Sequence, residues 1–218
     1  MLLNGTINLW KKDLRYVPAE IWQQISTEVL ILADNHLVEI SPEIQRLQNL
    51  RTLDLGHNQI AELPDAIGDL RGLRDFLYLH DNRLTSLPSS LGRLQRLRYL
   101  NIGGNQFSGF PECVVSMSGL IELRVADNQI SSVPDTIGGL SKLREVHLRN
   151  NRLRTLPSAI GTLSELRQID LRGNPIEVLP DMIAALPRLE KLDLRWVDTL
   201  QEPSWLRTLE DRGCSVYR

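Results

Sequence analysis

Two histidines are the residues of this 218-residue chain whose type and spacing come closest to a chemical site. His57 and His80 are 23 residues apart, and Asp34 and Asp81 lie 23 and 24 residues from His57, so that the repeat places them near the two histidines. Imidazole nitrogens and carboxylate oxygens are ligands of transition metals, so a fold that stacks such segments could form a metal site from them. The alternative, which we prefer, is that these side chains are solvated polar residues on an exposed sheet face. We therefore predict no metal site.

Motifs of catalysis and cofactor binding are absent from the sequence. It contains no P-loop, no GxSxG and no HExxH. The two cysteines, Cys113 and Cys214, lie far apart in the chain and lack the CxxC spacing of a structural zinc site. Gly103-Gly104 is better explained by turn geometry than by phosphate binding. We predict that the protein is not an enzyme and binds no cofactor.

The amino-acid composition argues against several classes of non-enzymatic protein. The chain is 42% hydrophobic and 24% charged with a net charge of −2, which does not fit a disordered chain or a strongly basic nucleic-acid-binding protein. No apolar run approaches the ~20 residues that span a bilayer, and the first residues lack the features of a signal peptide. Two lone cysteines indicate a reducing compartment. We expect a cytoplasmic protein that binds neither nucleic acid nor membranes.

A repeat organises almost the whole chain. Asparagine recurs every 23 or 24 residues, at Asn35, Asn58, Asn82, Asn105, Asn128, Asn151 and Asn174. Eight prolines keep nearly the same step, at Pro18, Pro42, Pro64, Pro88, Pro111, Pro134, Pro157 and Pro180. Alignment on asparagine gives the pattern LxxLxLxxNxLxxLPxxIGxL. In this pattern the chain resembles the leucine-rich-repeat family in its 23-residue intracellular form, and its ending resembles the tails of free-standing bacterial members.

One repeat shows how the pattern would fold. Leu53 and Leu55 alternate with polar or small residues, which is typical of a strand with one buried face. After the strand the chain must turn inward, and the amide of Asn58 can satisfy the backbone groups that this turn buries. Pro64 then fixes a backbone angle and disfavours a second sheet. Because no unit buries its apolar edge alone, stacked units provide the stability.

The resemblance implies an α/β solenoid, a curved right-handed horseshoe. We expect a concave parallel sheet of about nine strands and a convex side of short helices, 3-10 turns and loops. Residues 1–218 would form a single domain with a capping repeat at 1–26, regular repeats at 27–188 and a carboxy-terminal cap at 189–218. That cap should contain a short helix within 203–213 and end in an extended piece.

Three positions of each strand should face outward from the concave sheet. Among them, Phe76, Tyr78 and Tyr99 form an aromatic cluster beside small residues, as at many interface hot spots. Arg149, Arg172 and Arg195 form a ladder on consecutive strands. The predicted partner-binding residues are Trp10, Ile31, Phe76, Tyr78, His80, Tyr99, Arg124, His147, Arg149, Arg172 and Arg195.

Both features have a simpler alternative. The fourth repeat has 24 residues, so its strand can be threaded in two registers that exchange the faces completely. We choose the register that buries Leu77 and exposes Phe76 and Tyr78, because it keeps Asn82 in the turn. The arginines, for their part, could pair with Asp170 and Asp193 as a solvated charge lattice of little energetic value.

The sequence therefore predicts a monomeric protein-binding scaffold without enzymatic activity. Its arginine ladder should steer an acidic partner to the concave face. The alternative is the recognition module of a larger enzyme or secreted effector, such as a ubiquitin ligase, kinase or GTPase, with its catalytic part elsewhere.

Overall fold

The computed structural model describes residues 5–218, so the first four residues of the predicted amino-terminal cap lie outside the described part. Within it the chain forms one sheet whose parallel strands follow the order of the sequence, β1 to β10. The strands are β1 (Thr6–Asn8), β2 (Val29–Ile31), β3 (Thr52–Asp54), β4 (Phe76–Tyr78), β5 (Tyr99–Asn101), β6 (Glu122–Arg124), β7 (Glu145–His147), β8 (Gln168–Asp170), β9 (Lys191–Asp193) and β10 (Ser215–Tyr217).

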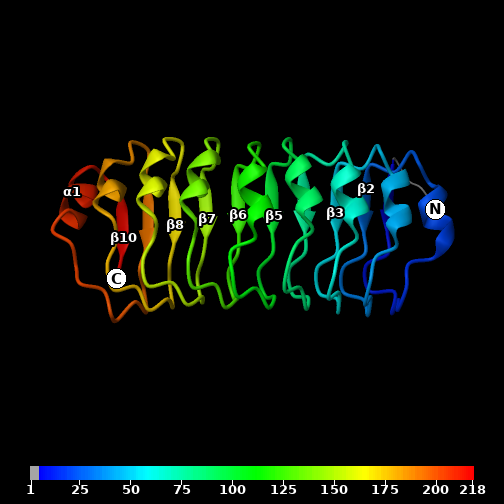
Figure 1. The fold of residues 1–218 in the computed structure, drawn as a ribbon, viewed down its shortest axis with the longest axis horizontal. Coiled ribbons are helices and arrows are strands. Elements are labelled where there is room, and N and C mark those ends of the chain that lie inside the picture. Colours follow the sequence, from blue (N-terminus) through cyan, green and yellow to red (C-terminus); the bar gives the residue numbers. More distant parts are fainter. Residues whose placement is uncertain (1–4) are drawn as a thin grey trace.

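A short helical turn follows each of the first eight strands (Figure 1). These 3-10 helices are η1 (Ala19–Gln23), η2 (Pro42–Arg46), η3 (Asp65–Asp69), η4 (Ser89–Arg93), η5 (Glu112–Ser116), η6 (Asp135–Gly139), η7 (Ser158–Thr162) and η8 (Asp181–Ala185). An α-helix, α1 (Leu206–Asp211), precedes β10. No helix in residues 5–218 is both long enough and apolar enough to cross a membrane.

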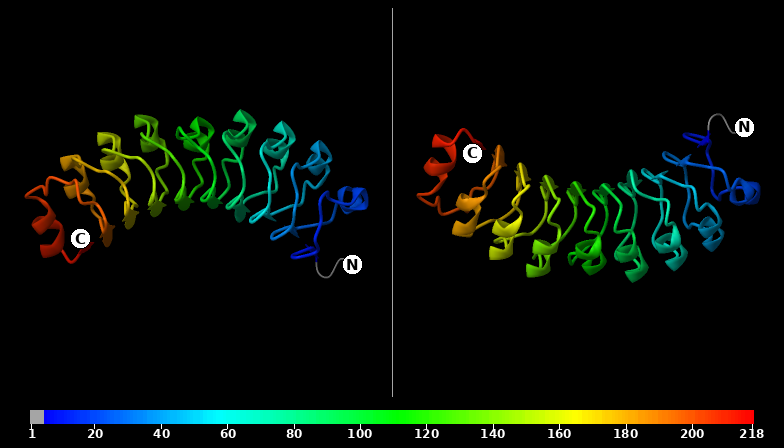
Figure 2. Two further views of the ribbon diagram at one scale, coloured as in Figure 1. Left: turned by 90° about the horizontal axis from the view of Figure 1, so that it is seen from below. Right: turned by 90° about the horizontal axis from the view of Figure 1, so that it is seen from above.

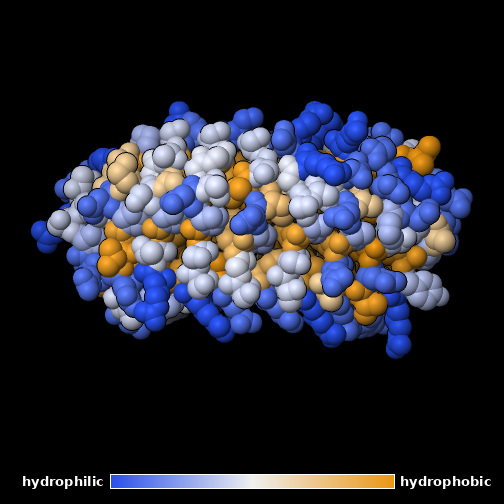
Figure 3. Space-filling model, in the orientation of Figure 1, coloured by the Kyte–Doolittle hydropathy of each residue, from blue (hydrophilic) through white to orange (hydrophobic). Residues whose placement is uncertain are grey.

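The layers form an arc with the strands on its concave side and the helical turns on its convex side (Figure 2). This confirms the predicted solenoid. The side that carries the helical turns faces the viewer in Figure 3, where hydrophobic residues form an interrupted band between hydrophilic rims. Single exposed apolar residues such as Met182 in η8 are ordinary on a protein surface.

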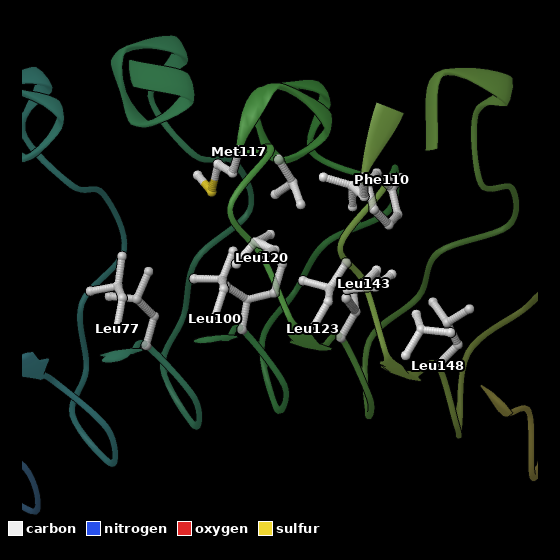
Figure 4. Close-up of a cluster of buried hydrophobic side chains, with 14 of the residues drawn as sticks. Leu77, Leu100, Phe110, Met117, Leu120, Leu123, Leu143 and Leu148 are labelled. Carbon is white, nitrogen blue, oxygen red and sulfur yellow. The ribbon is translucent and has the colours of Figure 1, made fainter. Parts of the chain in front are cut away.

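Leucines of successive repeats fill the space between the sheet and the helical turns. Leu77, Leu100 and Leu123 are register partners on β4, β5 and β6, and each is completely buried (Figure 4). Phe110 and Met117 fill the same layer nearer to the convex side. Burying one leucine side chain stabilises a fold by about 1.5–3 kcal/mol. Because each leucine packs against the next repeat, this stabilisation exists only in the stack.

The repeated asparagine binds backbone groups of its own turn and of the preceding repeat. Oδ1 of Asn58 accepts a hydrogen bond from the N–H of Leu37 at 3.0 Å. Its Nδ2 donates to the carbonyl oxygens of Leu32, Leu55 and Gly56, each at 3.1 Å. The amides of the other six repeated asparagines make the equivalent bonds. We call this row of buried amides the asparagine ladder.

The fourth repeat takes the register that keeps Asn82 in the ladder, as predicted. Leu77 is fully buried, whereas Phe76 is 42% exposed. In regular repeats the residue before the strand and the first strand residue donate to one carbonyl oxygen, as Arg51 and Thr52 do to Glu28. Before β4 this pair lies one residue earlier, because the N–H groups of Arg74 and Asp75 donate to the carbonyl oxygen of Arg51. The guanidinium of Arg51 also binds the Asp75 carboxylate, at 2.9 Å and 3.0 Å. The insertion is therefore absorbed before the strand, and the strand keeps its alternation.

The carboxy-terminal cap contributes one strand more than the nine predicted. Leu206 and Leu209 of α1 pack into the end of the core, and the chain then turns back at Gly213 with a φ of +88°. The extended piece after Cys214 pairs with β9 as a parallel strand instead of ending free. Cys214 is buried and Cys113 half-buried, and both are free thiols.

The asparagine ladder gives a prediction about stability. Asn105→Ala removes the acceptor of the Leu84 N–H and the donor to three carbonyl oxygens, so buried groups lose their partners at about 1–3 kcal/mol each. Asn101→Ala on the concave face loses one bond, to the Gly103 N–H, worth about 0.5–1.5 kcal/mol. Urea denaturation should show the larger loss for Asn105→Ala. Equal losses would contradict the role assigned to the ladder.

Candidate functional site

The concave face presents the outward side chains of the strands in straight rows, because the strands pair without offset. Phe76 lies beside Thr52 on one side and Tyr99 on the other, and Tyr78 lies between Asp54 and Asn101. This is the arrangement that the repeat spacing predicts.

Phe76, Tyr78 and Tyr99 form one continuous cluster, which we call the aromatic patch. The rings of Phe76 and Tyr78 are stacked at a centroid distance of 5.9 Å, and Tyr99 lies 5.5 Å from Phe76 and 4.9 Å from Tyr78. Burial raises the pKa of Tyr99 to about 12, an effect that the neighbouring Arg124 only partly offsets. The two tyrosines are half-buried by their neighbours, and Phe76 presents its ring to solvent.

His80 extends the aromatic patch toward the turns. Its ring lies 6.0 Å from that of Tyr78 and 4.8 Å from that of His57, in edge-to-face contacts. It rests on Gly56 of the neighbouring repeat, where a Cβ atom would come within 2.3 Å of the ring. Burial, followed by the neighbouring His57, lowers the pKa of His80. The ring is therefore held in its neutral form near pH 7.

A polar hollow of about 320 Å³ lies beside the aromatic patch, over β5 to β9. Gly103 and Ala126 leave space at its floor, and Arg124, His147 and Arg149 line it. His147 is surrounded by carboxylates: its Nε2 lies 3.4 Å from Glu145 and 3.8 Å from Glu122, and its Nδ1 lies 3.8 Å from an oxygen of Asp170.

The arginine ladder is paired with carboxylates, as in the alternative considered from the sequence, but the lattice is not solvated throughout, because Asp170 and Asp193 are buried. Arg172 donates to both oxygens of Asp170, at 2.9 Å and 2.7 Å, and Arg195 binds Asp193 with the same two distances. Arg149 pairs with Asp127 at 3.2 Å. The arrangement is thus a lattice of alternating charges on the concave face.

The two aspartates of this lattice are buried, yet they remain ionised. Burial alone would raise the pKa of Asp170, but hydrogen bonds from Arg172 and His147 outweigh it and hold this pKa well below its usual range. The pKa of Asp193 is likewise lowered, because bonds from Arg195 and the charge of Arg172 exceed the effect of burial.

The other predicted binding residues lie apart from the aromatic patch. Trp10 is 52% exposed at the amino-terminal end, where the ammonium of Lys11 lies 4.9 Å from its ring. Ile31 is half-buried on β2, and β3 separates it from β4. The sequence analysis missed Tyr217, whose ring lies 5.3 Å from both Lys191 and Arg195 at the far end of the face. The alternation in Ser215-Val216-Tyr217 was the available signal.

Family models for leucine-rich repeats match residues 25–84 and 141–196, and a second such model matches residues 96–117. The first alone covers more than half of the chain. The chain belongs to the leucine-rich-repeat family. Repeats of this family generally mediate protein–protein interaction.

Known proteins extend the comparison. A leucine-rich-repeat protein of Leptospira interrogans is 30% identical with a TM-score of 0.90, over 97% of this chain and 54% of that one. The ectodomain of the Arabidopsis thaliana membrane receptor kinase GASSHO1/SCHENGEN3, solved in complex with CASPARIAN STRIP INTEGRITY FACTOR 2, is 24% identical with a TM-score of 0.67, over 92% and 28%. The volume-regulated anion channel subunit LRRC8E of Xenopus laevis is 32% identical over 34% of this chain and 10% of its own length. The chain thus spans about half or less of each relative.

The charge lattice predicts how stability depends on pH. The pKa values of Asp170 and Asp193 are lower in the folded chain than the ordinary ~3.9 of the unfolded one, so their stabilisation is present above about pH 4 and is lost as the pH falls toward the folded values. Asp170→Asn should cost about 1.5–3 kcal/mol at pH 7, because hydrogen bonds to a charged group are lost. The variant should then lose less stability than the wild type between pH 7 and pH 3.

Urea denaturation at a series of pH values measures both effects. The same acid sensitivity in the two proteins would show that Asp170 does not contribute as described.

Proposed function

We propose that this protein is a binding scaffold without enzymatic activity, and that it holds a protein partner against its concave face through the aromatic patch. The observation that carries the proposal is the contact of three aromatic rings at positions where folding does not require them. The corresponding positions of most other repeats hold polar residues such as Thr52 and Asn101, and none holds a phenylalanine, tyrosine or tryptophan in β1 to β3 or β6 to β9. Aromatic residues next to small ones are the usual composition of an interface hot spot.

The rigid sheet supports the same proposal. Strands of neighbouring repeats place their outward side chains at a fixed spacing of about 4.8 Å, so that little ordering is needed when a partner binds. A pocket of about 200 Å³ offers room for a side chain of the partner. Its lining is half apolar or aromatic and half charged: Phe76, Tyr99 and Ile121 with Asp75, Arg98 and Glu122.

The charges on the face favour a particular kind of partner surface. Basic and acidic side chains are equal in number at the outward positions of β3 to β9: Arg124, Arg149, Arg172, Lys191 and Arg195 against Asp54, Glu122, Glu145, Asp170 and Asp193. The concave face therefore carries no net positive charge at these positions, in spite of the arginine ladder. We infer a partner whose contact surface carries both basic and acidic groups, in place of the acidic partner that the arginine ladder alone would favour.

A second candidate is favoured by the comparison of lengths. Because every relative described above is longer than this chain, the repeats could serve as the recognition module of a larger enzyme or effector. This role would use the same concave face.

A cytoplasmic location, a monomeric state and the absence of nucleic-acid and membrane partners stay predictions. The free thiols Cys113 and Cys214 support the prediction of a cytoplasmic location.

Replacing the tyrosines of the aromatic patch tests the proposal. We expect affinity capture from the native lysate to recover a partner with the wild type and to lose it with Tyr78→Ala/Tyr99→Ala. Hot-spot residues contribute about 2 kcal/mol or more, so each single variant should weaken binding of the purified partner about 30-fold. Calorimetry with the purified partner measures this loss.

Tyr16→Ala is the matched control, because Tyr16 is a tyrosine 76% exposed outside the sheet. It should bind like the wild type. If the double variant keeps the wild-type fold by circular dichroism and still captures the same partner, the aromatic patch is not the binding site.

A further inference from the structure

Three potential metal ligands meet at the turn side of β3 and β4. One ligand atom from each of His57, His80 and Asp81 lies within 4.8 Å of the other two. Nδ1 of His57 is 3.3 Å from Oδ2 of Asp81, and the two imidazole rings are in edge-to-face contact at 4.8 Å. Asp34, the fourth residue considered from the sequence, is instead paired with Lys11 at 3.2 Å.

The backbone brings two of these side chains into adjacent positions. His57 and Asp81 each directly precede an asparagine of the ladder, and both have a left-handed backbone with φ of +52° and +53°. The N–H of His57 donates to the carbonyl oxygen of His80 at 2.9 Å, and the N–H of Asn58 donates to that of Asp81 at 3.1 Å. Backbone hydrogen bonds between the two repeats therefore hold these residues in adjacent positions.

His80 offers a nitrogen that the rest of the described chain does not use. Its Nδ1 is buried and has no hydrogen-bond partner among residues 5–218. An unpaired buried polar atom costs free energy, and a metal ion or an ordered water can offset that cost. The ring itself fills the space over Gly56, where a Cβ atom would lie 2.8 Å from this nitrogen.

The accessibility of the cluster suits an ion that enters from solvent. The side chains of His57 and Asp81 are 56% and 48% exposed, so they can rotate to close the distances to a common centre. Asp81 forms no ion pair with an arginine or lysine within residues 5–218, and its ion-pair partner there is His57. By contrast, the other cluster with metal-ligand chemistry, Glu122, Glu145 and His147, already holds the guanidinium of Arg124 at 2.6 Å from Glu122.

Although the sequence alone led us to expect no metal site, we propose that His57, His80 and Asp81 form a binding site for a divalent transition-metal ion, of which Zn²⁺ is the type we test. Imidazole and carboxylate ligands suit Zn²⁺, and three protein ligands leave its fourth position open. That position faces solvent beside the aromatic patch, where water or a ligand of another molecule completes the coordination. The metal proposal does not rest on the proposed protein-binding function, although His80 also contacts Tyr78 of the aromatic patch.

Other repeats of this chain supply substitutions that the fold already accepts. His80→Ala introduces the residue that Ala33 and Ala126 provide at the same position, and His57→Asn and Asp81→Asn introduce the residue found at Asn150. His36→Gln is the matched control, because Gln59 occupies the same position in the next repeat. His36 lies outside the cluster, with its Nε2 2.9 Å from Asp13.

Calorimetric titration of the untagged protein with Zn²⁺ tests the proposal. We expect one ion per chain, and binding at least about tenfold weaker in His57→Asn, His80→Ala and Asp81→Asn, since even the loss of an outer-shell partner costs about 10–100-fold. Binding to His36→Gln should be unchanged. In the NMR spectrum, Zn²⁺ should shift the imidazole signals of His57 and His80 and leave those of His36 and His147 in place.

Several results would overturn the proposal. The proposal is wrong if the wild type does not bind Zn²⁺, or if His57→Asn and His80→Ala fold and bind it with wild-type affinity. It is also wrong if Zn²⁺ shifts only the imidazole signals of His147. The last result, with binding lost in Glu122→Gln, would assign the ion to the other cluster. Thermal melting of each variant without metal separates a lost site from a lost fold.

Discussion

The buried amide of the repeated asparagine is the interaction on which the rest of this structure depends. A parallel solenoid must turn its chain inward after every strand, and each turn removes backbone N–H and C=O groups from water. One asparagine side chain has an acceptor and two donor hydrogens, which match the groups that the turn leaves without partners. In Asn58 these bonds reach both its own turn and the preceding repeat. The ladder therefore closes the turns and joins neighbouring repeats at the same time.

The ladder has a consequence for the concave face. Because it fixes the register between repeats, residues at equivalent positions stand side by side, and any side chain placed there meets the same position of the next repeat. Phe76 and Tyr99 come into contact in this way, as do the charges of Arg172 and Asp193, which are 3.5 Å apart. The leucines and asparagines hold the fold, so the outward positions are free to carry binding residues.

The fold could be predicted from the sequence because the same pattern of leucine, asparagine and proline occurs in repeat after repeat. Burial, strand positions and even the register of the fourth repeat follow from the spacing of leucine and asparagine. The ion pairs of the charge lattice could not be predicted in the same way. The repeat spacing puts the Arg172 side chain where it can either extend into solvent or bind Asp170. Which of these it contacts depends on the side-chain conformation. The strand role of Ser215–Tyr217 was missed because that segment follows α1 instead of an asparagine turn.

The location of the aromatic patch supports the proposal that a partner binds there. The fourth repeat departs from the common length, but its extra residue is absorbed before β4, and Leu77, Leu79 and Asn82 keep their places in the core and the ladder. Folding is thus indifferent to what stands at positions 76 and 78. A large ring at such a position exposes apolar surface without adding to the core, as Phe76 does. Three rings in contact at these positions support the proposal that a protein partner covers them.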